Sequence, residues 1–200
     1  YGYRQNNQLR AAAACFEEAA KHDPGYAIAY SEWGMALADA HDFDKAVAPL
    51  RRAGELNPDL GIRYGRLAQV LEEKGDPAPT RKAMDLFLSG LGQLGLGRND
   101  EARKTFEECA RSDPKYALSY LCLSIVDIVE DKIPECRAHL EKAFAADPVF
   151  LGAWRPFMVA LFDTKDYNAA WGELRRIETA GGSVSTPFVE RLRAESGRDR

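Results

Sequence analysis

The amino-acid sequence predicts an all-α protein built from stacked pairs of antiparallel helices, about ten or eleven helices in all. An Asp-Pro or Asn-Pro dipeptide recurs in similar surroundings, and 34 residues separate Pro24 from Pro58 and also Pro114 from Pro148. Between these dipeptides, apolar residues recur at the spacing of one helix face instead of alternating as in a strand. A fixed period of this kind indicates a repeat architecture, in which each unit buries its apolar face against its neighbours.

Each unit is predicted to be a helix, a short turn and an antiparallel helix. The residue before a proline is pushed out of the helical region, whereas the proline itself is accepted in the first turn of the next helix. In the copy after Pro24, the polar break His41-Asp42 separates two apolar stripes. These stripes consist of Tyr30, Trp33 and Leu37, then Ala46, Leu50 and Ala53.

The repeated residues resemble the tetratricopeptide repeat, whose 34-residue pattern is W-x2-L-G-x2-Y…A-x3-F…P. One copy matches this pattern with Tyr30, Trp33, Gly34, Leu37, Ala46, Leu50 and Pro58. A later copy matches with Leu86, Gly90, Ala102, Phe106 and Pro114, and the N-terminal fragment with Tyr3, Ala12, Phe16, Ala19 and Pro24. The resemblance covers nearly the whole chain and implies an α-solenoid, a right-handed superhelix of antiparallel helix pairs.

The period divides the chain into seven segments. They are a partial repeat over 1–26, a repeat over 27–60, a shortened repeat with a proline-rich junction over 61–82, repeats over 83–116, 117–150 and 151–184, and a capping helix with a tail over 185–200. Because the chain begins in the middle of a repeat and without methionine, we expect it to be cut from a longer array.

The period breaks between Pro58 and Pro114, where the helix ending near Gly75 is followed by Asp76-Pro77-Ala78-Pro79 instead of a second helix. One possibility is that 61–74 closes a first sub-array and a second begins after the prolines. The other is that the helix from about Thr80 serves as the missing partner. The proline-rich segment cannot be helical throughout, so we expect a junction with an altered superhelical angle.

Composition excludes several classes of function. Lysine and arginine total 27 against 31 acidic residues, and the net charge of −4 argues against a nucleic-acid-binding surface. The most apolar stretch, 121–129, is too short to span a bilayer, and no signal peptide is visible, so a cytoplasmic protein without a membrane span is expected.

No catalytic, cofactor or metal site is expected. The four cysteines form no CxxC pair and the three histidines have no metal-ligand spacing, so buried free thiols are expected. The glycine-rich segment 89–97 lacks the Gly-Lys-Ser/Thr of a phosphate-binding loop. The acidic pairs at 17–18 and 107–108 fall where other copies carry Arg51-Arg52, Glu141-Lys142 and Arg175-Arg176, and this change of sign indicates a solvated helix face. The chain is therefore predicted not to be an enzyme.

The resemblance implies a concave groove lined by one stripe of each first helix. Its candidate partner-binding residues are Met35, Gln69, Phe87, Leu91, Leu121, Ile125, Arg155, Val159 and Phe162. The segment 118–129 is apolar on all sides and must be covered, either by tight curvature of the solenoid, by the irregular junction or by a partner.

We therefore predict a protein–protein interaction scaffold that binds an amphipathic helix or apolar peptide. Some family members grip the acidic tail of heat-shock chaperones with clustered cations. Here the stripe has no lysine or asparagine and Arg155 is its only base, so such a clamp is not expected. The alternative is a substrate-recognition or regulatory arm of a larger enzyme.

Overall fold

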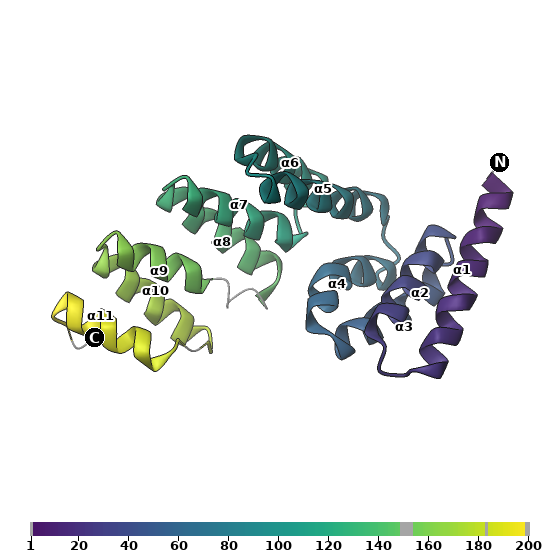
Figure 1. The fold of residues 1–200 in the computed structure, drawn as a ribbon, viewed down its shortest axis with the longest axis horizontal. Helices are drawn as coiled ribbons and strands as arrows, with labels where there is room; N and C mark the ends of the chain where they lie inside the picture. Colours follow the sequence, from purple (N-terminus) through teal and green to yellow (C-terminus); the bar gives the residue numbers. More distant parts are fainter. Residues whose placement is uncertain (1, 149–153, 183, 199–200) are drawn as a thin grey trace. The chain divides into compact units, whose positions relative to one another are not determined.

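The computed structural model describes residues 2–148, 154–182 and 184–198, in which the regular elements are eleven α-helices and a 3-10 position at Pro148. The predicted all-α class is therefore confirmed (Figure 1). The helices are α1 (Gly2–His22), α2 (Ala27–Asp39), α3 (Phe43–Leu56), α4 (Pro58–Glu72), α5 (Ala78–Gly95), α6 (Asn99–Ser112), α7 (Ala117–Val129), α8 (Ile133–Ala146), α9 (Trp154–Asp163), α10 (Tyr167–Thr179) and α11 (Thr186–Ser196). None of these helices combines the length and apolar character needed to cross a membrane.

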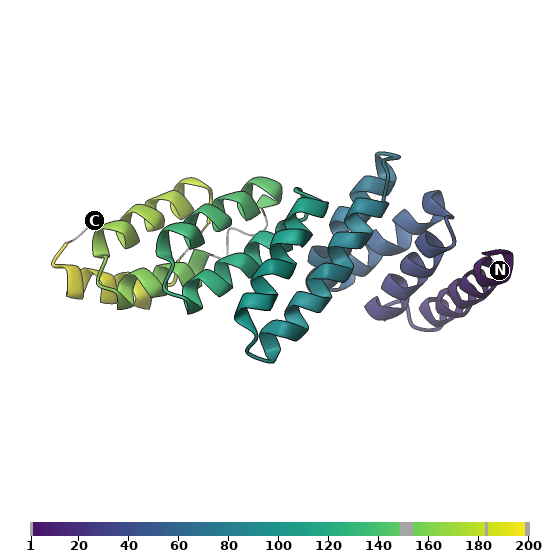
Figure 2. The ribbon, with the colours of Figure 1, turned by 90° about the horizontal axis from the view of Figure 1, so that it is seen from above.

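The chain divides into two compact units, Tyr1–Asp85 and Leu86–Arg200, which we call the N-terminal and C-terminal units. Within each unit, consecutive helices pack side by side and run in opposite directions (Figure 1, Figure 2). The boundary falls inside α5, so the start of this helix belongs to the first unit and its end to the second.

The turns between paired helices repeat the same backbone geometry. His41, Gly97, Asp131 and Lys165 all have a positive φ, between 56° and 72°. At the first of these turns, the N–H of Asp42 donates to the carbonyl oxygen of Leu37 at 2.9 Å. This left-handed residue followed by a backward hydrogen bond ends the first helix of a pair and satisfies its last carbonyl groups.

A close glycine contact joins the two helices of a pair at equivalent places. A Cβ built on Gly34 would lie 2.6 Å from Cγ of Leu50, and one built on Gly90 would lie 2.4 Å from Cε1 of Phe106. Both distances are far below van der Waals contact, so only glycine allows this approach. The shared contact shows that α2–α3 and α5–α6 are copies of one unit.

At the proline-rich junction, α4 ends at Glu72 and the next helix begins only at Ala78. The carboxylate of Asp76 accepts a hydrogen bond from the Ala78 N–H at 2.9 Å. Arg81, in the first turns of α5, donates to Sδ of Met35 at 3.4 Å and pairs with Asp39. The start of α5 therefore lies against α2, and α4 is followed by no second helix of its own.

The core of the C-terminal unit is continuous from α8 to the last helix. Phe157 and Leu161 from α9, Trp171 from α10 and Leu192 from α11 are all buried in one apolar cluster. The indole N–H of Trp171 donates to Oγ of Ser196 at 3.0 Å. The last helix thereby covers the end of the α9–α10 pair.

Candidate partner-binding face

Three large aliphatic side chains are exposed at equivalent points of the C-terminal unit. Leu91 in α5, Ile125 in α7 and Val159 in α9 follow one another at intervals of 34 residues. Their exposed fractions are 37%, 40% and 46%. We call these three residues the apolar ladder. All three belong to the candidate set predicted from the sequence.

The ladder rests on a packed base. Leu121, also a predicted contact, is half-buried and packs with Ile128 against the core cluster formed by α8, α9, α10 and α11. On α7, Cys122, Leu123 and Val126 are buried, whereas Val129 is exposed. The apolar α7 is thus covered except along the line of Ile125 and Val129.

Two predicted groove residues are core residues in the structure. Phe87 is buried, and its ring meets that of Tyr116 edge-on at a centroid distance of 6.0 Å. Phe162 is also buried, beside the ring of Phe188, and Arg191 lies 4.8 Å above its ring centre. Their neighbours cover them, so both residues support the face instead of forming its surface.

The other predicted contacts lie in different surroundings. Met35 is half-buried under Arg81, as described above. Gln69 is exposed and its amide nitrogen donates to Glu73 at 2.9 Å. The side chain of Arg155 lies outside the described residues.

Charge is almost absent from two first helices of the C-terminal unit, α7 and the part of α5 in this unit, whereas α9 carries Arg155 and Asp163. The stretches Leu86–Gly95 and Ala117–Val129 contain one charged residue, Asp127, in a chain that is 29% charged overall. The carboxylate of Asp127 is fully buried. Ile125 and its surroundings therefore present an uncharged surface to solvent.

Asp127 is the centre of a structural polar network. Its two carboxylate oxygens meet Nη2 of Arg103 at 2.8 Å and Nδ1 of His139 at 2.6 Å. Hydrogen bonds from Lys132 and Arg103 lower the pKa of Glu130, which lies at the edge of this network. These contacts tie α6, α7 and α8 together, and no group of side chains in the described part of the chain is arranged to hold a metal ion.

The thiols do not form a reactive site. Burial raises the pKa of Cys109, Cys122 and Cys136 to about 12 in each case, so these groups stay protonated. The expectation of buried thiols is wrong for Cys15, which is exposed on α1. Sequence spacing could not reveal this difference, because Cys15 lies on a helix face that no other helix covers.

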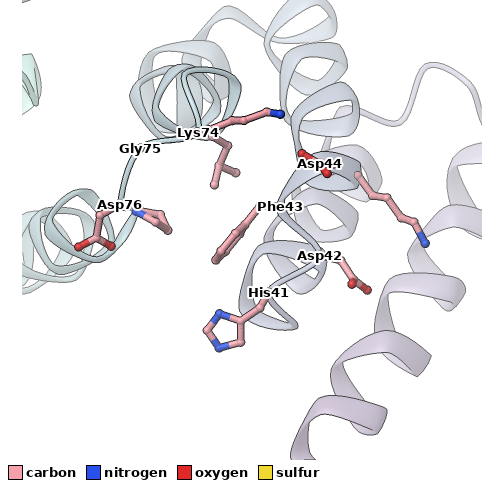
Figure 3. Close-up of a pocket in the computed structure, with 10 residues that line it drawn as sticks. His41, Asp42, Phe43, Asp44, Lys74, Gly75 and Asp76 are labelled. Atoms are coloured by element: carbon pink, nitrogen blue, oxygen red, sulfur yellow. The ribbon is translucent and has the colours of Figure 1, made fainter.

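A cavity of about 660 Å³ lies between the α2–α3 turn and the end of α4. Phe43 points into it between His41 and Lys74 (Figure 3). Two of its aspartates already have partners, because Asp42 pairs with Arg10 and Asp76 caps α5. The cavity carries charges of both signs and no arrangement of a nucleophile with a base.

Comparison with known proteins agrees with this architecture. A family model described as tetratricopeptide repeat matches residues 86–116. The human protein named antiviral innate immune response effector IFIT1 is 36% identical over 88 residues, which are 40% of this chain and only 18% of that protein.

Two solved structures are similar to nearly the whole chain. The TPR2AB domain of yeast Sti1, in a complex titled with pHSP90, has a TM-score of 0.49 and 16% identity over 98% of this chain and 94% of that one. The type IV pilus biogenesis factor PilW has a TM-score of 0.49 and 19% identity over 98% of this chain and 82% of that one.

The repeat is thus supported by three independent observations: the 34-residue period, the shared glycine contact between paired helices and the match to the family model. Residues 86–116 therefore match a tetratricopeptide repeat, and the 34-residue period extends the resemblance beyond them.

Proposed function

We propose that this protein is a non-catalytic scaffold that binds an amphipathic or apolar segment of a partner protein on the apolar ladder. The observation that carries the proposal is the exposure of Leu91, Ile125 and Val159 at equivalent points, the first two on helix stretches almost without charge. Exposed aliphatic residues that gather on one face are typical of an interaction site.

The expected binding energy comes from the removal of these side chains from water. Burial of one aliphatic side chain contributes roughly 1.5–3 kcal/mol. A helix with apolar residues on one face is a suitable partner, because it can cover several rungs of the ladder at once. Leu121 and Arg155 remain predicted contacts beside the ladder, and Met35 and Gln69 remain predicted contacts in the N-terminal unit.

The surface favours a partner segment recognised through apolar contacts. Electrostatic attraction between exposed charges weakens as salt is added, whereas burial of apolar surface does not depend on such attraction. Binding at the ladder should therefore persist at high ionic strength. A charged clamp for an acidic tail would show the opposite dependence.

The experiment uses displayed random peptides that bind the full chain but not a folded Leu91→Asp variant, so that the selected peptides are ladder binders. Ile125→Asp should weaken the selected peptides by roughly tenfold to a hundredfold, as expected from the loss of one buried aliphatic side chain. Leu96→Asp is the matched control, because Leu96 is 71% exposed but lies in the α5–α6 turn, off the ladder. Circular dichroism establishes that both variants are folded. Equal affinity for both variants, or binding that disappears in high salt, would refute the proposal.

A further inference from the structure

Two arginines of the C-terminal unit occupy equivalent places on second helices. Arg103 and Arg137 each stand eleven residues before the proline of an Asp-Pro dipeptide, Pro114 and Pro148. The Arg103 side chain reaches the first helix of the following pair, α7. The Arg137 side chain reaches both helices of the following pair, α9 and α10. Arg103 pairs with Asp127 at 2.8 Å, and the guanidinium of Arg137 lies 5.9 Å above the ring centre of Phe157.

The N-terminal unit has an alanine at this place. Ala13 stands eleven residues before Pro24, and Trp33 stands nine residues after it, as Phe157 stands nine residues after Pro148. An aromatic ring is therefore kept in the N-terminal unit, but the arginine that would cover it is absent. A cavity of about 770 Å³ lies at this point between α1, α2 and α3.

The exposure of Trp33 agrees with this comparison. The equivalent residues Leu67, Leu123 and Phe157 are at most 2% exposed. Trp33 is only half-buried and lines the cavity. The small side chains around it leave this space open, and they belong to Ala13, Ala14, Ala48 and Pro49.

We propose that the cavity over Trp33 binds an arginine side chain of a partner protein, in the position that Arg137 takes over Phe157. Indole is the most favourable aromatic face for a cation, and the flat guanidinium group stacks on it better than an ammonium group does. Arg137 also pairs with the carboxylate of Glu173 at 2.9 Å. The charged residues that line the cavity are the carboxylates of Glu17 and Asp42 and the cations Arg10 and Lys45.

Of these two carboxylates, Glu17 is the better partner for an incoming guanidinium. Asp42 is already bound by Arg10, whose Nε lies 2.9 Å away. Glu17 has only an ion pair with Lys21 at 3.0 Å, between neighbouring turns of the same exposed helix. Pairs of this kind contribute little, so Glu17 can exchange its partner at small cost.

Two variants of the full chain test the site from opposite directions. Ala13→Arg supplies the missing internal arginine and should block the cavity. Trp33→Leu removes the aromatic face but keeps an aliphatic side chain, as Leu67 and Leu123 do at the equivalent places. Thermal melting establishes that each variant is folded, and Trp33→Leu keeps the test decisive if Ala13→Arg does not fold.

The probes are peptides from a displayed random library that bind the unaltered chain but not the Ala13→Arg variant. If Ala13→Arg does not fold, Trp33→Leu replaces it in the selection. These peptides should share an arginine, and its replacement by citrulline should weaken them about threefold to thirtyfold. Peptides selected against Ala13→Arg should also be weakened by Trp33→Leu to a similar extent. Selected peptides that share leucine or phenylalanine instead, or the absence of any selective peptide, would overturn the proposal.

The result does not depend on the apolar ladder. Ile125→Asp should leave arginine peptides unaffected, because Ile125 and Trp33 lie in different units. Failure of one proposal can therefore be distinguished from failure of the other.

Discussion

Replacement of Gly90 by alanine adds a methyl group where α5 touches the ring of Phe106. The new Cβ would lie 2.4 Å from Cε1, 2.8 Å from Cδ1 and 2.8 Å from Cζ of that ring. Carbon atoms in contact are separated by about 3.5–4.0 Å, so the ring or the helix must move by about 1 Å. Phe106 is fully buried, so the ring can move only at the expense of its neighbours in the core.

The size of the effect follows from two opposing contributions. Insertion of a methyl group into a packed core costs typically 1–3 kcal/mol. Alanine in place of glycine inside a helix contributes about 1 kcal/mol in the stabilising direction. The net expectation for Gly90→Ala is therefore a loss of about 1 kcal/mol of unfolding free energy, within a range of about 0–2 kcal/mol.

Gly92→Ala is the matched control in the same helix. A Cβ on Gly92 would meet no atom within 4 Å, so only the gain in helix propensity remains. The difference between the two variants cancels this gain and isolates the cost of the clash, about 1–3 kcal/mol. Urea unfolding followed by circular dichroism measures both variants, and midpoints are compared because repeat arrays can unfold in steps. If Gly90→Ala is as stable as Gly92→Ala, α5 and α6 do not pack as described.

Three further predictions concern the backbone, the thiols and a buried acid. Lys165 has a φ of 61°, in the left-handed region that glycine adopts more easily. Lys165→Gly should therefore relieve strain of about 1 kcal/mol and raise the midpoint of thermal unfolding. An unchanged or lower midpoint would contradict this. Ellman's reagent at pH 8 should modify only Cys15 in the folded protein and all four thiols in denaturant, and Cys15→Ser should abolish the reaction of the folded state. Burial raises the pKa of Glu173, and the nearby Arg137 and Arg176 oppose this shift. The protonated carboxyl group therefore stabilises the fold at a pH below the ordinary pKa of glutamate, and this stabilisation is lost as the pH rises through the raised pKa. Glu173→Gln should therefore be at least as stable as the unaltered chain at pH 7, with its advantage shrinking toward pH 4; a variant that is less stable at pH 7 would show that the ion pair with Arg137 dominates.

Much of the fold could be predicted from local sequence features. The recurring prolines precede helix starts, and Tyr30, Trp33 and Leu37 recur at the spacing of one helix face. These signals act over a few residues and repeat every 34, so they predict helix pairs without knowledge of long-range contacts. The junction after Gly75 was predicted to be irregular, but the contact of Arg81 with Met35 joins residues 46 positions apart and no local signal indicates it.

The binding faces depended on the tertiary structure. Phe87, Leu91 and Phe162 all fall on the predicted apolar stripe, yet Leu91 is exposed while the two phenylalanines are buried. A helical period identifies which residues share a face but not which of them a neighbouring ring covers.

The sequence by itself determined that this protein is a stack of helix pairs with an apolar first-helix stripe and no expected catalytic chemistry. Only the tertiary structure decided which part of that stripe reaches solvent, and that a cavity remains over Trp33 because Ala13 is too small to cover it. The physical reason is that exposure depends on side chains brought together from several helices, whereas helix formation depends on residues close in the chain.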